Sequence, residues 1–109
     1  MDVLRIIERE GDRVVAQLPE DVDLYTTSSV STAVNALIDS GCCHLVLDAT
    51  RTLHMDSTGV SALVGWYQRL DVVGGSLGVT GLHDGLLRMF TILGLDNVMS
   101  LTPGPTATA

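Results

Sequence analysis

Two periodicities alternate along the chain. Short apolar runs bounded by turn residues predict strands, and segments whose apolar residues recur every three or four positions predict amphipathic helices. The clearest helical stripe contains Val60, Leu63, Val64, Tyr67 and Leu70. The predicted elements are, in order, strands at residues 3–7 and 13–18, a helix from 26 or 27 to 40, a strand at 44–49, a helix from 56 to 73, a strand at 76–80, a helix from 84 to 93 and a strand at 97–101.

This order predicts an α/β fold built on a mixed, mostly parallel β-sheet. Strands that alternate with helices form parallel neighbours through right-handed crossovers, with the helices packed on the sheet. The first two runs, joined by the turn Glu10-Gly11-Asp12, add an N-terminal antiparallel hairpin. We expect a single domain over residues 1–102, and a disordered tail over the small, proline-containing segment 103–109.

Several local details are also predicted. The strand at 44–49 contains consecutive apolar residues, which indicates cover on both faces. The segment 50–55 is a loop or a short strand, and Asp84 is placed to cap the third helix. Tyr67 falls on the core stripe of the second helix, whereas Trp66 lies off its centre. We therefore interpret Trp66 as a half-buried surface residue, with a contact to a partner as the alternative.

Composition narrows the classes of partner. The chain has 109 residues, of which 13 are acidic and 6 basic, so its net charge is -7. Nucleic acids and anionic membrane surfaces attract clustered lysine and arginine, so neither is expected to bind. Charged residues interrupt the N-terminal segment, and no apolar run approaches the roughly 20 residues that span a bilayer. We expect a cytoplasmic protein that is steered towards basic partner surfaces.

The two cysteines, Cys42 and Cys43, are adjacent. A disulfide between neighbouring residues is strained, so free structural thiols are expected, and a redox-responsive pair or an intermolecular disulfide is the alternative. With His44 beside them they do not have the spacing of zinc ligands. His54 and His83 are dispersed along the chain. We therefore predict no metal site and no cofactor.

Enzyme chemistry is not predicted. A serine nucleophile needs a general base and an oxyanion site, and Ser57 lies in no Gly-x-Ser-x-Gly elbow. The Gly-x-x-x-x-Gly-Lys-Ser/Thr loop that cradles nucleotide phosphates is also missing from the sequence. We expect no catalytic residues.

The run Leu-His-Met-Asp-Ser-Thr-Gly-Val at residues 53–60 follows the hydrophobic strand that ends at Asp48, and it opens an amphipathic helix. This arrangement resembles the STAS domain of anti-sigma factor antagonists. In that family a hydrophobic strand ending in Asp is followed by a short loop, then by Asp-Ser-Ser/Thr-Gly and an aliphatic helix.

Three further segments agree with this family in the same order, so the resemblance extends from residue 3 to residue 101. The sequence departs from the family at Glu20, where a glycine is usual, and at 81–84, where an Asn-Pro-like loop is usual. The agreeing segments are 21–26, which resembles the family's Gly-Glu-Ile-Asp-Leu-Tyr-Thr, 74–77, which resembles its Gly-Gly turn into a strand, and 93–96, which resembles its Thr-Gly-Leu ending of the third helix.

The resemblance implies an anti-sigma factor antagonist, as in stress-response or sporulation control. The unphosphorylated protein would bind an anti-sigma factor that is also a serine protein kinase, and so release a sigma factor. Phosphorylation of Ser57 would end this binding, and a protein phosphatase would restore it. By the same resemblance, Asp23, Asp56, Ser57, Thr58 and Gly59 form the partner-binding surface, and the protein is a monomer or a weak dimer.

Other interpretations stay open. Ser57 at a helix start could act only as a cap. The fold could also serve as a phosphorylation-independent STAS scaffold, or as a redox-responsive regulator through Cys42 and Cys43, in a signalling complex. A STAS domain in an anion transporter is disfavoured by the short chain without a membrane segment.

Overall fold

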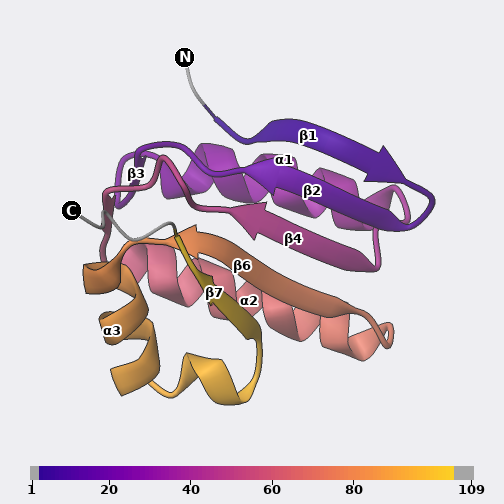
Figure 1. Ribbon diagram of the computed structural model, residues 1–109. Helices are drawn as coiled ribbons and strands as arrows, with labels where there is room; N and C mark the ends of the chain where they lie inside the picture. The colour runs from indigo at the N-terminus through magenta and orange to yellow at the C-terminus, as the bar shows by residue number, and fades with distance from the viewer. Residues whose placement is uncertain (1–2, 105–109) are drawn as a thin grey trace.

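Five strands form one mixed sheet in the order β1-β2-β4-β6-β7 (Figure 1). The structure is a computed structural model, and it describes residues 3–104. The β1–β2 hairpin is antiparallel and every other pair in this sheet is parallel, so the predicted α/β class is confirmed. The strands are β1 (Arg5–Glu10), β2 (Arg13–Gln17), β4 (His44–Asp48), β6 (Ser76–Leu82) and β7 (Ser100–Pro103), and the helices are α1 (Thr27–Asp39), α2 (Ser57–Val72) and α3 (Asp84–Ile92).

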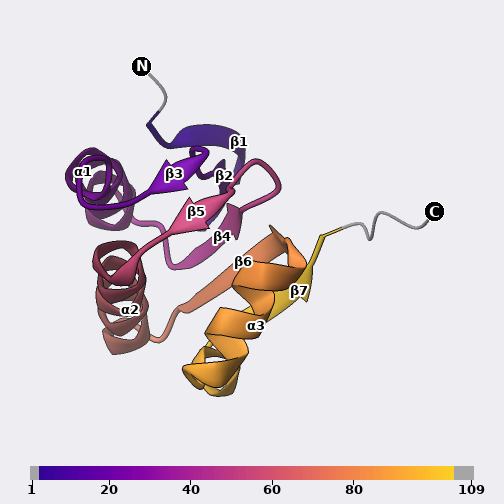
Figure 2. The same cartoon turned by 90° about the vertical axis from the view of Figure 1, so that its left-hand side faces the viewer.

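A second, very short parallel sheet lies beside the first. It pairs β3 (Asp21–Val22) with β5 (His54–Met55), in the register Asp21 to His54 and Val22 to Met55. The sequence predicted a connection at the first segment and a loop or short strand at the second. Their pairing brings the segments that precede α1 and α2 side by side (Figure 2).

The hydrophobic core lies between the sheet and the pair α1 and α2, which cover the same face (Figure 2). Along β4, Leu45 and Leu47 are buried, whereas His44, Val46 and Asp48 are half-buried. The prediction that this strand is covered on both faces was therefore wrong. A parallel strand is continuously apolar in sequence when helices cover both of its faces, but only one face of β4 is fully covered.

The side chain of Trp66 is buried, unlike its sequence interpretation, whereas Tyr67 packs against the core as predicted. Trp66 is only 3% exposed, and its Nε1 donates to Ser31 Oγ of α1 at 3.2 Å. Tyr67 is half-buried. Because α2 packs against α1 as well as against the sheet, its buried line is turned towards α1. That line consists of Gly59, Leu63, Trp66 and Leu70.

The C-terminal part differs in four details from the prediction. His83 caps α3 in place of Asp84, which lies in the first turn. A short 3-10 helix, η1 (Leu95–Asn97), follows Gly94, and the last strand begins later than predicted. The predicted tail boundary at Pro103 falls within β7. The rest of that predicted tail, 105–109, lies outside the described residues.

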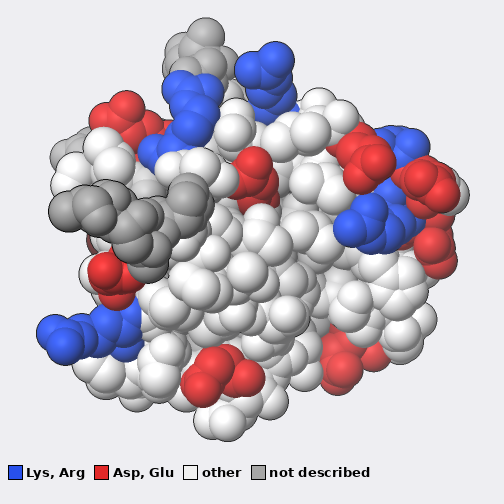
Figure 3. All heavy atoms as spheres, in the orientation of Figure 1, with Lys and Arg blue, Asp and Glu red and all other residues white. Residues whose placement is uncertain are grey.

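Charged side chains gather at the margins of the face in Figure 1, while most of its centre is uncharged (Figure 3). This centre is the face of the sheet opposite α1 and α2 (Figure 1). Within residues 3–104, no helix combines the length and apolar character needed to cross a membrane.

Candidate functional site

The β3–β5 pair brings the two predicted site segments together. Asp56 N donates to Val22 O at 3.3 Å, and Leu53 N donates to Glu20 O at 2.8 Å. These backbone bonds align the loop before α1 with the loop before α2. Parallel strands end at the same edge, so both helices start there.

Asp56 connects the two helix starts through its carboxylate. Its Oδ1 accepts a hydrogen bond from Gly59 N at 3.0 Å, and its Oδ2 accepts one from Leu24 N at 3.1 Å. The first bond caps α2, and the second holds the loop before α1. A carboxylate at this position also interacts favourably with the positive end of the helix dipole.

Ser57 is the first residue of α2, and its side chain is exposed. Because Asp56 makes the side-chain capping bond, the hydroxyl of Ser57 does not act as the cap. The interpretation of Ser57 as a cap is therefore wrong.

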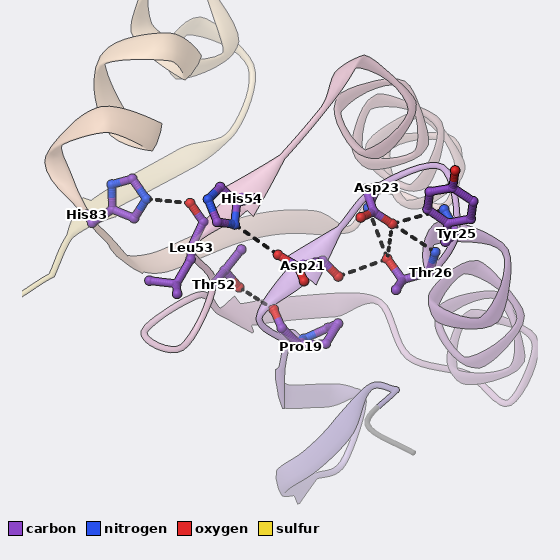
Figure 4. Close-up of polar contacts among 9 residues, drawn as sticks. All are labelled: Pro19, Asp21, Asp23, Tyr25, Thr26, Thr52, Leu53, His54 and His83. Atoms are coloured by element: carbon purple, nitrogen blue, oxygen red, sulfur yellow. Dashed lines mark hydrogen bonds and ion pairs between the residues drawn. The ribbon is translucent and has the colours of Figure 1, made fainter.

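Asp23 folds the loop in which it lies. Its Oδ1 accepts hydrogen bonds from Tyr25 N at 2.9 Å and from Thr26 N at 3.1 Å (Figure 4). The Thr26 hydroxyl also donates to Asp21 O at 2.8 Å. The carboxylate of Asp23 is half-buried and does not bond to Asp56. Asp23 and Asp56 are linked indirectly, because both accept hydrogen bonds from the loop before α1.

Gly59 and Thr58 lie behind the exposed surface. Gly59 is buried, and a Cβ atom there would overlap Val22 O and lie 2.8 Å from Met55 Cγ. Thr58 is half-buried. Gly59 thus allows α2 to start against β3, and it supports the surface without being exposed itself.

Three apolar side chains near this site are exposed: Leu24 by 66%, Tyr25 by 87% and Leu53 by 51%. None of the three is among the site residues predicted from the sequence. For Leu24 and Tyr25 the sequence did carry a signal. Apolar residues in a loop directly after Asp23 are expected to be exposed, because a loop does not bury them in the core. For Leu53 the sequence carried no comparable signal.

The cysteines lie at the other end of β4 from these loops. Cys42 is buried, and its burial raises the pKa of the thiol, with a smaller contribution from Cys43. Cys43 is half-buried, and both cysteines are free. The reactive form of cysteine is the thiolate, so the raised pKa makes Cys42 less reactive. Among the described residues, no three His, Cys, Asp or Glu side chains gather as metal ligands would.

Comparison with known proteins identifies the family of this chain. The family described as "Mlab, STAS domain" matches residues 7–103. The anti-sigma-B factor antagonist of Listeria monocytogenes is 31% identical over 98 residues, covering 90% of this chain and 86% of that protein. Such relatives are regulatory proteins rather than enzymes.

Solved structures share the fold. An anti-sigma factor antagonist from Mycobacterium paratuberculosis superimposes with a TM-score of 0.80 at 23% identity, covering 95% of this chain and 86% of that one. The Bacillus cell fate determinant SpoIIAA in its phosphorylated form superimposes with a TM-score of 0.73 at 20% identity, covering 95% and 92%. This chain therefore belongs to the STAS-domain family of anti-sigma factor antagonists.

Proposed function

We propose that this protein is a cytoplasmic anti-sigma factor antagonist switched by phosphorylation of Ser57. Without phosphate it binds an anti-sigma factor that is also a serine kinase, and a sigma factor is released. The observation that carries the proposal is the exposed Ser57 hydroxyl at the start of α2, beside a carboxylate that already serves as the cap. Exposed Leu24 and Tyr25 provide apolar contact area in the neighbouring loop.

Phosphorylation changes the charge of this surface without unfolding it. The kinase transfers the γ-phosphoryl group of ATP to Ser57 Oγ, ADP leaves and the hydroxyl proton is lost. The phosphate adds about -1.5 to -2 charges, which the start of a helix tolerates. The nearby carboxylate of Asp56 makes the patch strongly negative, and a partner docked over it must face that charge. A coupling free energy of about 1–3 kcal/mol weakens binding about 5- to 150-fold.

The relatives support the same cycle. The Listeria relative is named for antagonism of an anti-sigma factor, and the Bacillus neighbour was solved in a phosphorylated form. A phosphatase that hydrolyses the phosphoserine returns the protein to its binding form. Thr58 and Gly59 support the start of α2 in this surface, and Asp23 keeps the adjacent loop in place.

The test is intact-mass analysis after incubation with ATP and each anti-sigma kinase of the host. One added phosphate is expected on the wild type and on Ser61→Ala, a control at an exposed position of the same helix. None is expected on Ser57→Ala. A phosphate that persists on Ser57→Ala would contradict the assignment. Binding without any modification would instead favour a phosphorylation-independent scaffold.

The charge mechanism has its own test. Ser57→Asp should bind the anti-sigma factor about 5- to 150-fold more weakly than the wild type, whereas Ser57→Ala should bind as the wild type does. Isothermal titration calorimetry measures both. If Ser57→Ala also loses binding, the hydroxyl itself is a contact and charge repulsion is not the switch.

A further inference from the structure

His83 links the start of α3 to the loop that precedes Ser57. Its Nδ1 lies 3.1 Å from Gly85 N and 3.3 Å from Leu86 N. Its Nε2 lies 2.9 Å from Leu53 O (Figure 4). Backbone N–H groups only donate and a carbonyl oxygen only accepts. Nδ1 therefore serves as the acceptor and Nε2 as the donor, so both ring nitrogens are in use.

The first turn of α3 is shaped to admit this ring. A Cβ atom on Gly85 would lie 3.0 Å from His83 Cε1 and 3.3 Å from His83 Nδ1. Both contacts are closer than ordinary van der Waals separation. A glycine at this position therefore leaves the space in which the imidazole folds back over the helix.

The backbone of Leu53 is held from two sides. Its N–H donates to Glu20 O at 2.8 Å, and its carbonyl accepts from His83. The side chain nevertheless remains 51% exposed. In the next residue, His54 Nδ1 contacts Asp21 Oδ1 at 3.0 Å across the β3–β5 pair. An apolar side chain is thus presented to solvent from a loop whose backbone is fixed.

We propose that the docking surface extends from Ser57 along β5 to Leu53, and that His83 is the positioning residue that holds Leu53 for the anti-sigma factor. This inference rests on the proposed function. Ser57 lies four positions after Leu53, or about 13 Å along an extended chain. A typical interface covers about 800 Å² on each partner, which accommodates both residues. Leu53 would then be an apolar anchor beside the polar residues around Ser57.

Two substitutions separate the roles of the two ring nitrogens. In His83→Asn the amide oxygen takes the place of Nδ1 and still caps α3, but the side chain is too short to reach Leu53. In His83→Gln the amide N–H takes the place of Nε2–H and reaches Leu53, but the cap is lost. The Tm should therefore fall by roughly 4 to 8 °C in His83→Gln and change little in His83→Asn.

The two His83 variants should affect binding to the anti-sigma factor in the opposite order from their effect on the Tm. With the anti-sigma kinase that modifies wild-type Ser57 as the probe, His83→Asn and Leu53→Ala should each bind roughly tenfold more weakly, and His83→Gln should bind as the wild type does. Amide hydrogen exchange of Leu53 in the free protein should be faster in His83→Asn only. This readout needs no partner.

Each result has a distinct meaning. Unchanged binding by His83→Asn or by Leu53→Ala, with the wild type binding normally, would overturn the extension and leave the proposed function intact. Weaker binding that follows the loss of Tm would show that His83 acts only through stability. If no host anti-sigma factor binds the wild type, the proposed function fails and this inference fails with it.

Discussion

At the start of α2, Asp56 has a structural role and Ser57 is the residue of the proposed switch. Asp56 uses both carboxylate oxygens in hydrogen bonds, one to the helix and one to the loop before α1. Ser57 carries no part of the cap, so it can be modified while the cap stays in place. In the proposed switch, the phosphate would be added next to a carboxylate that two hydrogen bonds hold in place.

The two cysteines differ in their environment, and their reactivity should differ accordingly. At pH 8, iodoacetamide should alkylate Cys43 before Cys42, because burial raises the pKa of Cys42 and lowers its thiolate fraction. Peptide mass mapping after a short reaction measures the order. Equal modification of both thiols in the folded protein would contradict it, and denatured protein serves as the control.

The raised pKa of Cys42 also predicts how the stability of the fold changes with pH. The folded-state pKa of Cys42 lies above its unfolded value. The stability that the neutral thiol contributes is therefore complete below the unfolded pKa, and it is lost as the pH rises through the folded pKa. This stability is therefore lost only in alkaline solution, above the neutral pH range in which the proposed switch works.

At the scale of elements, the short pair β3–β5 determines where the surface forms. The pair has only two residues in each strand, so it depends on its contacts with α2 and the adjoining loops. Gly59 is the closest of these contacts, because a side chain there would overlap the backbone of β3. The start of α2 and the loop before α1 are thereby held as one surface.

Two glycines of α2 provide a matched pair of substitutions. Gly59→Ala should destabilise the fold by about 1–3 kcal/mol through overpacking against Val22 and Met55. Gly65→Ala has no atom within 4 Å of the added Cβ and should stabilise the same helix by about 0.5–1 kcal/mol. Urea unfolding measures both. Equal effects from the two would show that helix propensity, rather than contact with β3, governs Gly59.

At the scale of the whole molecule, the helices α1 and α2 cover one face of the sheet and leave the other largely open (Figure 1). The polar network between these helices includes Arg69, which donates to Asn35 Oδ1 at 2.8 Å and to Asp39 Oδ1 at 2.7 Å. Trp66 is buried at the same contact. The helix pair and the sheet therefore share one core.

A shared core predicts cooperative unfolding. Trp66 is the single tryptophan of the chain and reports on the contact between α1 and α2, whereas far-UV circular dichroism reports on all elements. Both signals should give the same urea midpoint. If the tryptophan signal changes at a lower urea concentration, the helix pair separates from the sheet before the sheet unfolds.

The order of elements and the place of the candidate site were predictable from the sequence. Periodicity is a local property, and the boundaries of α1, α2 and α3 follow within a residue from apolar spacing, turn residues and glycines, whereas β6 extends two residues beyond its predicted end. The run Asp56-Ser57-Thr58-Gly59 is contiguous, so its position at the start of a helix was also predictable.

Other features depend on contacts between distant segments. The pairing of β3 with β5, the burial of Trp66 against Ser31 and the link from His83 to Leu53 each join residues that are about 30 or more positions apart. No local pattern encodes such contacts, because they arise only when the helices pack and the loops meet at one edge. The sequence alone thus determined the order of the elements and the position of Ser57 at the start of a helix. The tertiary structure decided which side chains surround that serine.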